Sequence, residues 1–355
     1  MKKGKGEIAK SKLNNSKNIS ELLLNPTVNL DEIFKKFNKL NVLIIGDVMI
    51  DSYLWGNVNR ISPEAPVPIV SVTKKESRLG GAANVALNIQ SMGANPILCS
   101  VIGKDDSSKL FFELLKKQNL SAAGIIKSKN RITTVKTRVI GVNHQMLRVD
   151  DEIETPIAEE ELIALSAIIE KLIVSKKVDV VIFEDYDKGC ITAELIKISI
   201  AIARQNKIPI VVDPKKKNFM SYQGVTLFKP NLKELKEGLK LDFDHCNIKE
   251  LEKVAAAFIK KQNIDTLLIT LSEKGIYTHS EKTKKVIPAH IRNVSDVSGA
   301  GDTVISLAAL CLALNLPPIV TATLANLAGG LVCEKVGVVP IDKNQLLSEA
   351  LKLKL

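Results

Sequence analysis

The chain has 355 residues, of which 45% are hydrophobic and 25% are charged. This composition allows one large α/β domain or two smaller ones, and it excludes a wholly disordered chain, a collagen-like chain and a disulfide-stapled miniprotein. The net charge of +11 favours a nucleic acid, an anionic membrane or an anionic substrate as the partner.

Nearly half of this excess charge lies in the first 20 residues, which hold six lysines and one glutamate. They contain no apolar run that could serve as a signal peptide. We interpret residues 1–38 as a basic, disordered leader, with a nucleic-acid-binding arm as the alternative. Residues 39–355 are expected to form a single domain. The scattered cysteines and the lack of a long apolar segment predict a cytoplasmic protein that does not enter a membrane.

Short apolar runs alternate with amphipathic stretches from residue 41 onward. The first run, 41–46, is rich in β-branched residues and ends at a glycine, as buried parallel strands do. Further strands are predicted at 96–102, 178–183, 208–212, 225–228 and 266–271, and helices at 82–92, 159–173, 193–205 and 248–262. This alternation predicts an α/β fold with a doubly wound, mostly parallel sheet and helices on both faces. The site of such a fold lies beyond the carboxyl ends of the strands.

Two segments break the alternation of strands and helices. Residues 52–78 contain three prolines and alternating apolar residues, and residues 131–150 also alternate. Such patterns are typical of extended strands with one exposed face. Together the two segments predict a small β-sheet lid beside the main domain.

The strongest chemical signal is Asp-Val-Ser-Gly-Ala-Gly-Asp at residues 296–302, directly before an apolar helix. The backbone N–H groups of Gly299, Ala300 and Gly301 would lie at the positive end of the helix dipole and form an anion hole. Asp302 is placed to take a proton from a hydroxyl beside a bound phosphate. The alternative is a glycine-rich loop with an ordinary aspartate near the helix start. The sequence contains neither a GxxxxGK[ST] phosphate-binding loop nor a GxGxxG motif after a strand.

This motif resembles the late signature of the ribokinase-like (PfkB-type) carbohydrate kinases. A second family signature, a Gly-Gly turn into a helix, is present at Gly80 and Gly81. The resemblance implies that these glycines let the backbone approach a sugar and that Asn84 binds its hydroxyls. Asp51 matches the family's sugar-binding aspartate, since a carboxylate suits paired hydroxyls; the alternative is an ordinary turn aspartate.

Four further stretches narrow the resemblance to the heptose 7-phosphate kinases. They are Arg-Ile-Ser-Pro-Glu-Ala-Pro-Val-Pro at 60–68, Glu-Asp-Tyr-Asp-Lys-Gly at 184–189, Val-Asp-Pro-Lys at 212–215 and Lys-Pro-Asn-Leu-Lys-Glu at 229–234. The similarity covers about residues 40 to 345. It implies ATP-dependent phosphorylation of the anomeric C1 hydroxyl of D-glycero-D-manno-heptose 7-phosphate, in the synthesis of ADP-heptose for lipopolysaccharide. The departures are mild: Glu184 stands where a small residue precedes Asp-Tyr, and Lys216 stands where glycine often follows Asp-Pro-Lys.

The resemblance also implies a role for each part of the site. Asp302 would be the general base, and the amides of residues 299–301 would stabilise charge on the transferred phosphoryl group. Asn231 and Glu234 match the element that organises Mg²⁺ through water, although a polar helix start would have the same sequence. Candidates for the ATP side of the site are Thr270, Ser272, Gly275 and Asn326.

The phosphate of the substrate requires cations. Lys188 is the first candidate, followed by Arg60, Arg138 and Arg148 in the lid segments. For each arginine, an exposed position on a solvated lid strand is an equally good interpretation. The closest alternative function is a ribokinase-like kinase for another sugar or sugar phosphate. A non-catalytic sugar-binding paralogue is a further alternative, which the retained Asp302 opposes.

Partners beyond the substrates follow partly from the resemblance. We expect no nucleic acid as a partner, because only 4% of the residues are aromatic and no recognition motif is present. The lid strands favour a homodimer through edge pairing. Bifunctional relatives carry a nucleotidyltransferase with a His-x-Gly-His motif, which this sequence lacks. We therefore expect that a separate polypeptide supplies adenylyl transfer. A requirement for a monovalent cation is left open.

Overall fold

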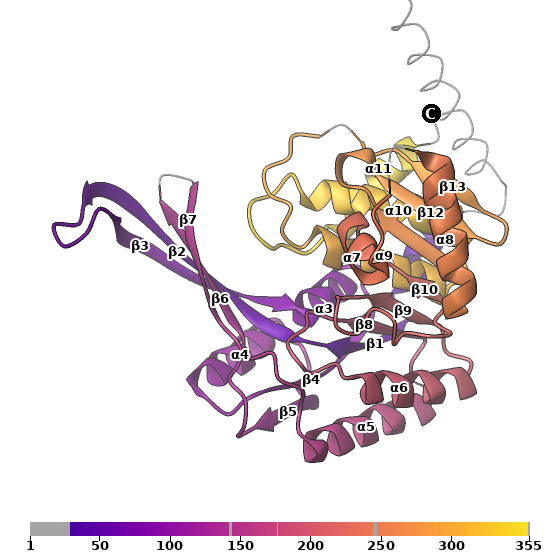
Figure 1. Cartoon of the computed structure of the whole chain (residues 1–355), viewed down its shortest axis with the longest axis horizontal. Coiled ribbons are helices and arrows are strands. Elements are labelled where there is room, and N and C mark those ends of the chain that lie inside the picture. The colour runs from indigo at the N-terminus through magenta and orange to yellow at the C-terminus, as the bar shows by residue number, and fades with distance from the viewer. Residues whose placement is uncertain (1–28, 142–143, 176, 244–246, 291, 354–355) are drawn as a thin grey trace, which may run out of the picture.

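The computed structural model describes residues 29–141, 144–175, 177–243, 247–290 and 292–353. Its main feature is a nine-stranded sheet with the order β13-β12-β11-β10-β9-β8-β1-β4-β5 (Figure 1). In the order of the sheet, the seven strands from β11 through β8 and β1 to β5 pair in parallel. Strands β12 and β13 form an antiparallel edge. The strands span Asn41–Gly46 (β1), Asn95–Gly103 (β4), Gly124–Ser128 (β5), Val180–Glu184 (β8), Ile210–Asp213 (β9), Leu227–Phe228 (β10), Thr266–Thr270 (β11), Ile276–Ser280 (β12) and Lys284–Ile287 (β13).

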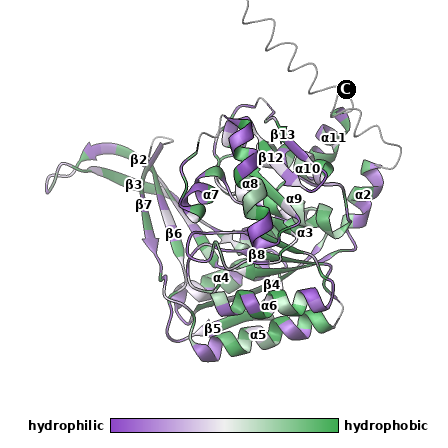
Figure 2. Cartoon of the chain, turned by 45° about the vertical axis from the view of Figure 1, so that its right-hand side comes forward, coloured by the Kyte–Doolittle hydropathy of each residue, from purple (hydrophilic) through white to green (hydrophobic). Residues whose placement is uncertain are grey.

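Helices cover both faces of this sheet. Val42 and Ile44 of β1 pack into one core, and Leu43 and Ile45 pack into the other, because successive strand residues point to opposite faces. One core contains residues of Leu30–Phe37 (α2), Ala82–Ser91 (α3), Asp106–Lys117 (α4), Ala300–Ala313 (α9), Pro318–Val332 (α10) and Lys343–Lys352 (α11). The other contains residues of Glu159–Val174 (α5), Ala193–Gln205 (α6), Leu232–Leu239 (α7) and Ile248–Gln262 (α8). Figure 2 shows that α5, α6 and α8 carry both hydrophobic and hydrophilic residues, as helices lying on a sheet do.

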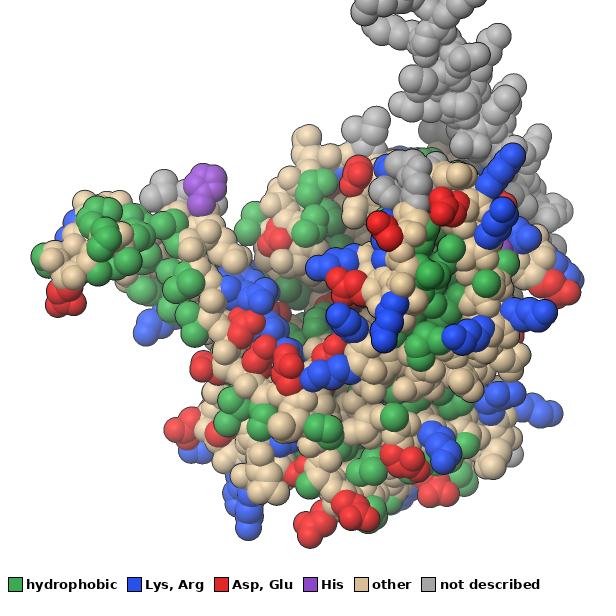
Figure 3. All heavy atoms as spheres, viewed as in Figure 1, with side chains coloured by type: hydrophobic (Ala, Val, Ile, Leu, Met, Phe, Trp, Pro, Cys, Tyr) green, Lys and Arg blue, Asp and Glu red, His purple; other side chains and the backbone are tan. Residues whose placement is uncertain are grey.

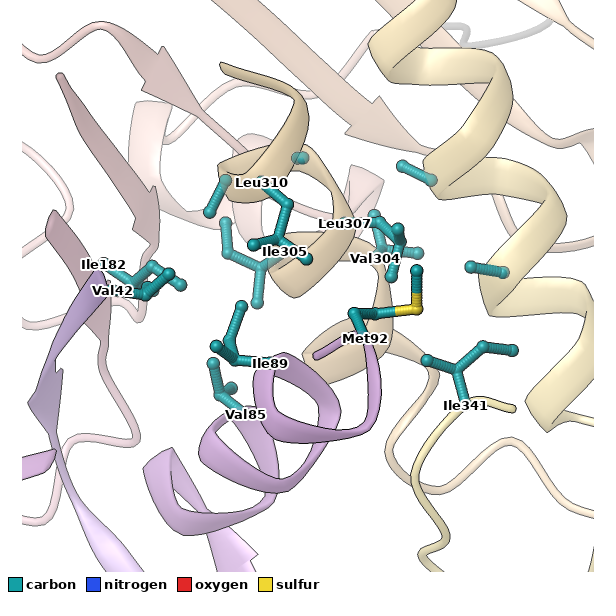
Figure 4. Packing of buried hydrophobic residues seen from close by; sticks show 14 of the residues in the cluster. Val42, Val85, Ile89, Met92, Ile182, Val304, Ile305, Leu307, Leu310 and Ile341 are labelled. Atoms are coloured by element: carbon teal, nitrogen blue, oxygen red, sulfur yellow. The ribbon is translucent and has the colours of Figure 1, made fainter. Parts of the chain in front are cut away.

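Helices α3 and α9 pack against each other within the first core. Val85 and Ile89 of α3 lie close to Ile305 of α9 (Figure 4). Two buried hydrogen bonds reinforce this packing: Asn88 Oδ1 accepts from Thr303 Oγ1 at 3.0 Å and from the backbone N–H of Ile341 at 3.0 Å. The start of α9 is therefore fixed relative to the start of α3.

A second sheet of four strands projects from the main domain (Figure 1). Its order is β3-β2-β6-β7, with β2 and β6 parallel and the outer pairs antiparallel. The strands span Val48–Ile61 (β2), Pro68–Gly81 (β3), Val135–Gly141 (β6) and His144–Asp151 (β7). The predicted lid is thus confirmed, and it arises directly from the main sheet because β2 begins two residues after β1.

The predicted α/β architecture is also confirmed, and every predicted strand and helix overlaps an observed one. The antiparallel hairpin of β12 and β13 was not predicted. Its strands have five and four residues, too short to give a clear alternating pattern.

The boundary of the expected leader is wrong at its C-terminal end. Residues 1–28 lie outside the described residues, but Leu30–Phe37 forms a helix with an Asn29 N-cap. Four apolar residues of this helix are buried: Leu30, Ile33, Phe34 and Phe37. Their spacing is that of an amphipathic helix, a pattern that the lysine-rich composition of the preceding residues obscured. The folded domain therefore begins before residue 39.

Helix α2 gives a test of this boundary. Phe37 is fully buried, so Phe37→Ala should lower the free energy of unfolding by about 3–5 kcal/mol through lost burial and a cavity. Urea denaturation measures this change. Lys35→Ala, on the exposed face of the same helix, should change it by less than about 0.5 kcal/mol. A loss below about 1 kcal/mol for Phe37→Ala would contradict a structural role for α2.

Candidate active site

The start of helix α9 is the centre of the candidate site. Gly299 is the N-cap residue and has a φ of 79°, in the region that favours glycine. Ala300 and Gly301 open the helix, so their backbone N–H groups lie at its positive end. Asp302 is in the first turn and is only 5% exposed. The backbone N–H groups and the carboxylate that the sequence analysis singled out thus lie at one helix terminus.

Both carboxylate oxygens of Asp302 accept hydrogen bonds from other elements. Asn84 Nδ2, in α3, donates to Oδ2 at 2.6 Å, and the Tyr186 hydroxyl, after β8, donates to Oδ1 at 2.8 Å. Burial raises the pKa of Asp302, and these two donors oppose the rise. The arrangement can hold an ionised carboxylate in a buried position, as a general base requires.

The Gly-Gly turn connects this centre to the base of the lid. Gly81 has a φ of 58°, and a Cβ added there would lie 2.5 Å from the carbonyl oxygen of Asp47. A Cβ at Gly80 would meet the carboxylate of Asp51, whose Oδ1 accepts a hydrogen bond from Arg138 Nη1 at 2.6 Å. The two glycines therefore permit a close approach between β3 and β2, next to the helix that holds Asn84.

A group of buried charges lies beside the start of α9, at the carboxyl ends of the strands. Lys229 Nζ is 2.7 Å from Asp213 Oδ2, and a Cβ at Gly301 would lie 3.7 Å from both atoms. Glu184 is the register partner of Asp213 on the neighbouring strand and is 1% exposed. Burial, with the charges of Asp213 and Asp302, raises the pKa of Glu184 well above its usual range. Three carboxyls and a lysine thus lie close together beside the start of α9.

Asn231 and Glu234 form a capping box at the start of α7. The Asn231 side chain accepts from the Glu234 N–H at 2.8 Å, and Glu234 Oε2 accepts from the Asn231 N–H at 2.8 Å. Glu234 Oε1 pairs with Lys215 Nζ. Within the described ranges, no group of three or more His, Cys, Asp or Glu could hold a metal ion. Glu234 fits a Mg²⁺ ion held through water, because Mg²⁺ is commonly bound by one or two carboxylates together with substrate phosphates.

The residues predicted for the nucleotide lie on one side of this capping box. Thr270, at the end of β11, forms a β-bridge with Asn231, and a surface hollow is lined by residues 231–233 and 270–274, which include Ser272. Gly275 follows, with a φ of 94°, and a Cβ there would collide with the backbone near Pro288. Asn326 Nδ2, in α10, donates to the carbonyl oxygen of Pro288 at 2.9 Å. The structure therefore brings these four predicted residues into one region.

Of the cations predicted for the substrate phosphate, three are paired with carboxylates and the fourth lies near the outer end of the lid. Lys188 Nζ lies 2.8 Å from a carboxylate oxygen of each of Glu152 and Glu154, and Arg138 is paired with Asp51. Figure 3 shows this mixture of acidic and basic side chains at the base of the lid. Arg148, the cross-strand partner of Arg138 on β7, is exposed and pairs with Asp150 at 2.9 Å. Arg60 is exposed near the outer end of β2, and the fold of a single chain does not place it near Asp302.

Sequence reasoning missed several residues of the site. Tyr186 was noted only as part of a motif, and Asp213 and Lys229 were not assigned a role. Asp47 was also missed, although its carboxylate accepts backbone N–H groups of Tyr186, Lys188 and Cys190 at 2.8, 3.2 and 3.0 Å. Polar residues at the end of buried strands were the available signal, since strand ends meet at one edge of a parallel sheet.

These features define the class of protein, a ribokinase-like kinase fold with an acidic residue at a glycine-rich helix start. Phosphofructokinase-2 from Escherichia coli in complex with potassium superposes with a TM-score of 0.74 and 16% identity, covering 89% of this chain and 99% of that chain. Ribokinase from Arabidopsis thaliana, complexed with ribose and ATP, has a TM-score of 0.67 and 15% identity, covering 87% and 98% of the two chains. At such identities the similarity establishes the fold.

The sequence comparisons establish the family. The model of the pfkB family carbohydrate kinases matches residues 39–344, so the chain belongs to this family and is a carbohydrate kinase. A protein from Pelobacter propionicus described as "Bifunctional protein HldE" is 36% identical over 320 residues, which is 90% of this chain and 65% of that protein. The protein of the same description from Helicobacter pylori is 42% identical over 300 residues, 83% of this chain and 63% of that protein. The chain therefore spans less than two thirds of the length of these curated relatives.

The family match confirms the resemblance that the sequence motifs indicated. None of the helices in the described ranges combines the length and hydrophobicity that a membrane crossing requires.

Asp185, next to Tyr186, provides a test of the buried charges. Burial and the nearby Asp47 raise the pKa of Asp185 to about 7, although three hydrogen-bond donors oppose this rise. The folded state therefore keeps the proton of the Asp185 carboxyl to a higher pH than the unfolded chain, where aspartate titrates at about pH 4. The contribution of this proton to the free energy of unfolding is complete below about pH 4 and is lost as the pH rises through about 7.

In Asp185→Asn this side chain no longer titrates. We expect the melting temperature of the wild type, relative to that of Asp185→Asn, to fall steadily between pH 5 and pH 8. Asp242→Asn is the matched control, because Asp242 is exposed and its pKa is lowered by Lys236. The difference in melting temperature between wild type and Asp242→Asn should therefore stay constant over this pH range. A constant difference for Asp185→Asn as well would show that Asp185 does not titrate in this range.

Proposed function

We propose that the protein transfers the γ-phosphoryl group of ATP to the anomeric C1 hydroxyl of D-glycero-D-manno-heptose 7-phosphate. The observation that supports this most is the buried Asp302 carboxylate at the Gly-Ala-Gly start of α9. The unusual Ile-Ser-Pro-Glu-Ala-Pro-Val-Pro stretch at 61–68, which resembles the heptose 7-phosphate kinases, supports the choice of substrate. The product would be the 1,7-bisphosphate and ADP.

The reaction requires a base, an anion hole and a fixed acceptor. Asp302 takes the proton of the C1 hydroxyl while the C1 oxygen bonds to the γ-phosphorus and the bond from that phosphorus to the β–γ bridging oxygen breaks. The amides at residues 299–301 stabilise charge on the transferred group. Asp51 and Asn84 bind sugar hydroxyls, beside the turn formed by Gly80 and Gly81. Support for this assignment comes from the hydrogen bond between Asn84 in α3 and Asp302 in α9, and from the position of Asp51 in β2, beside Gly80.

The nucleotide would lie on the side of α7 and β11. Thr270, Ser272 and Gly275 would contact the nucleotide, with Asn326 towards the adenine. Glu234, supported by Asn231, would hold Mg²⁺ through water. When bound, this ion would neutralise part of the charge of the phosphates. A monovalent cation is a further candidate, given that the phosphofructokinase-2 neighbour is described as a complex with potassium.

Cations at the base of the lid are proposed to receive the 7-phosphate. Lys188 is the first choice, because the substrate phosphate can replace Glu152 and Glu154 as its partner. Arg138 lies beside Asp51 and thus near the sugar. Arg148 and Arg60 lie further along the lid, and their contribution would depend on how the lid closes or pairs.

The catalytic proposal is tested by a coupled ADP-release assay. With wild type, heptose 7-phosphate should be preferred over fructose 6-phosphate, ribose and adenosine. Asp302→Asn should lower kcat by about 10²–10⁴, as expected for loss of a general base. Asp106→Asn, at an exposed position of α4, is the control and should retain the wild-type rate. Preference for an unphosphorylated sugar would contradict the substrate, and unchanged turnover in Asp302→Asn would contradict the mechanism.

A second copy of the chain is the proposed partner of the lid. The lid sheet has two open edges, β3 and β7, and exposed apolar side chains that Figure 3 shows on the projecting arm. They are Ile61, Val67, Val72, Met146, Leu147 and Val149. Such a surface with unpaired strand edges favours association with another sheet. The curated relatives are described as bifunctional, and we propose that the second activity in this pathway is a nucleotidyltransferase.

Light scattering tests the dimer. Leu147→Lys, at a side chain that is 57% exposed, should convert the dimer to a monomer because it places a charge in the proposed interface. Ile163→Lys is the matched control: Ile163 is 62% exposed on α5, away from the lid, and its substitution should leave the dimer intact. A wild-type protein that is monomeric at micromolar concentration would contradict the proposal.

A further inference from the structure

We propose that the Tyr186 hydroxyl is a positioning group that keeps the negative charge on Asp302 rather than on the neighbouring Glu184. This inference rests on the proposed role of Asp302 as the base. It concerns a residue outside the general kinase signatures, in the stretch Glu-Asp-Tyr-Asp-Lys-Gly after β8.

Three carboxyls compete for protons in this buried region: Asp302, Asp213 and Glu184. Asp213 has the ammonium group of Lys229 at 2.7 Å. Asp302 has two neutral donors, the Tyr186 hydroxyl at 2.8 Å and the Asn84 amide at 2.6 Å. Glu184 Oε2 is fully buried and has no hydrogen-bond partner among the described residues. Since hydrogen bonds to a carboxylate favour its charged form, a proton in this group is held most favourably by Glu184.

Tyr186 is held in the geometry that this role requires. Its backbone N–H donates to Asp47 Oδ2, and the loop that follows contains two residues with positive φ, Asp187 at 56° and Gly189 at 84°. The ammonium group of Lys215 lies 5.4 Å from the centre of the tyrosine ring. Burial and the adjacent carboxylates raise the pKa of the phenol well above 10. Tyr186 therefore remains a donor at neutral pH.

The phenol does not block proton transfer. A carboxylate oxygen accepts more than one hydrogen bond, so Asp302 can keep Tyr186 and Asn84 as partners and still accept from a sugar hydroxyl. Without the phenol, Asp302 has one donor fewer and still faces the same charges. The groups that face it are Asn84 from α3, Glu184 from β8, Asp213 from β9 and Lys229 after β10. The pKa of Asp302 should then rise, and the base should be protonated over more of the acidic range.

The test is the pH dependence of kcat in Tyr186→Phe, measured with ATP, Mg²⁺ and the preferred sugar phosphate. At pH 6, kcat should fall by up to about 10-fold, the largest loss that a one-unit rise in the pKa of the base produces. The acid limb of the profile should move upwards by about one pH unit, so the loss is smaller at pH 8.5. The KM of the sugar should stay within about threefold, because the phenol contacts the base and not the substrate.

Two variants separate positioning from a general structural effect. Tyr222→Phe removes another buried phenol, which donates to Asp185 at 2.8 Å; it should lower the melting temperature without moving the acid limb. Glu184→Gln replaces a neutral carboxyl with a neutral amide and should leave the acid limb in place. If Glu184 instead holds a negative charge in the wild type, this substitution will move the limb to lower pH, which would overturn the proposal even if Tyr186→Phe fails to fold.

Combination with Asp302→Asn separates this inference from the proposed function. In the Asp302→Asn background, adding Tyr186→Phe should change the residual rate by less than about threefold, because the two groups act as one unit. If Asp302→Asn retains full activity, the proposed function and this inference both fail. If Asp302→Asn is impaired while Tyr186→Phe keeps the wild-type pH profile, only the inference fails.

Discussion

The site depends on one constraint, the burial of the Asp302 carboxylate at the start of α9. A charge without hydrogen bonds in such a place is costly, so donors must reach it from other parts of the fold. Asn84 comes from a helix more than 200 residues earlier in the chain, and Tyr186 comes from the loop after the central strand β8. The Gly-Gly turn before α3 and the Asp47 side chain that fixes the loop of Tyr186 are required to deliver those two donors.

Charged side chains at the base of the lid are also paired with oppositely charged groups. Lys136 and Lys188 both pair with Glu152, at the end of the lid segment, and Arg138 pairs with Asp51. In the described part of the chain, these cations are thus already paired with carboxylates of the lid strands or of the chain that follows them. Under the proposed function, an incoming anion would replace such a carboxylate, which keeps the cation paired and limits the desolvation cost. The replacement would also link the position of the lid to the substrate.

The sequence was sufficient for the architecture because buried parallel strands and amphipathic helices differ clearly in pattern. The strand at 41–46 and the helices at 193–205 and 248–262 were predicted with the bounds that the structure has. It was also sufficient to place Asp302 near the start of a helix, and Gly80 and Gly81 at a turn into another, since these positions depend on local motifs. It could not reveal Tyr186 or the pairing of Lys188, because both depend on contacts between residues far apart in the chain. The α2 helix was missed for a different reason: the composition of its neighbours concealed four apolar residues at helical spacing.

The net charge of +11 is a weaker guide to the binding partner once these ion pairs are considered. Part of it belongs to residues 1–20, and the cations nearest the site are matched by carboxylates. Overall charge raises the local concentration of anions over long distances, where salt screens it. Binding and transfer of a phosphoryl group depend instead on groups within a few ångströms, where burial strengthens each interaction. Under the proposed function, the choice of anionic substrate would therefore depend on these buried ion pairs, and the hydrogen bonds to Asp302 would favour its charged form.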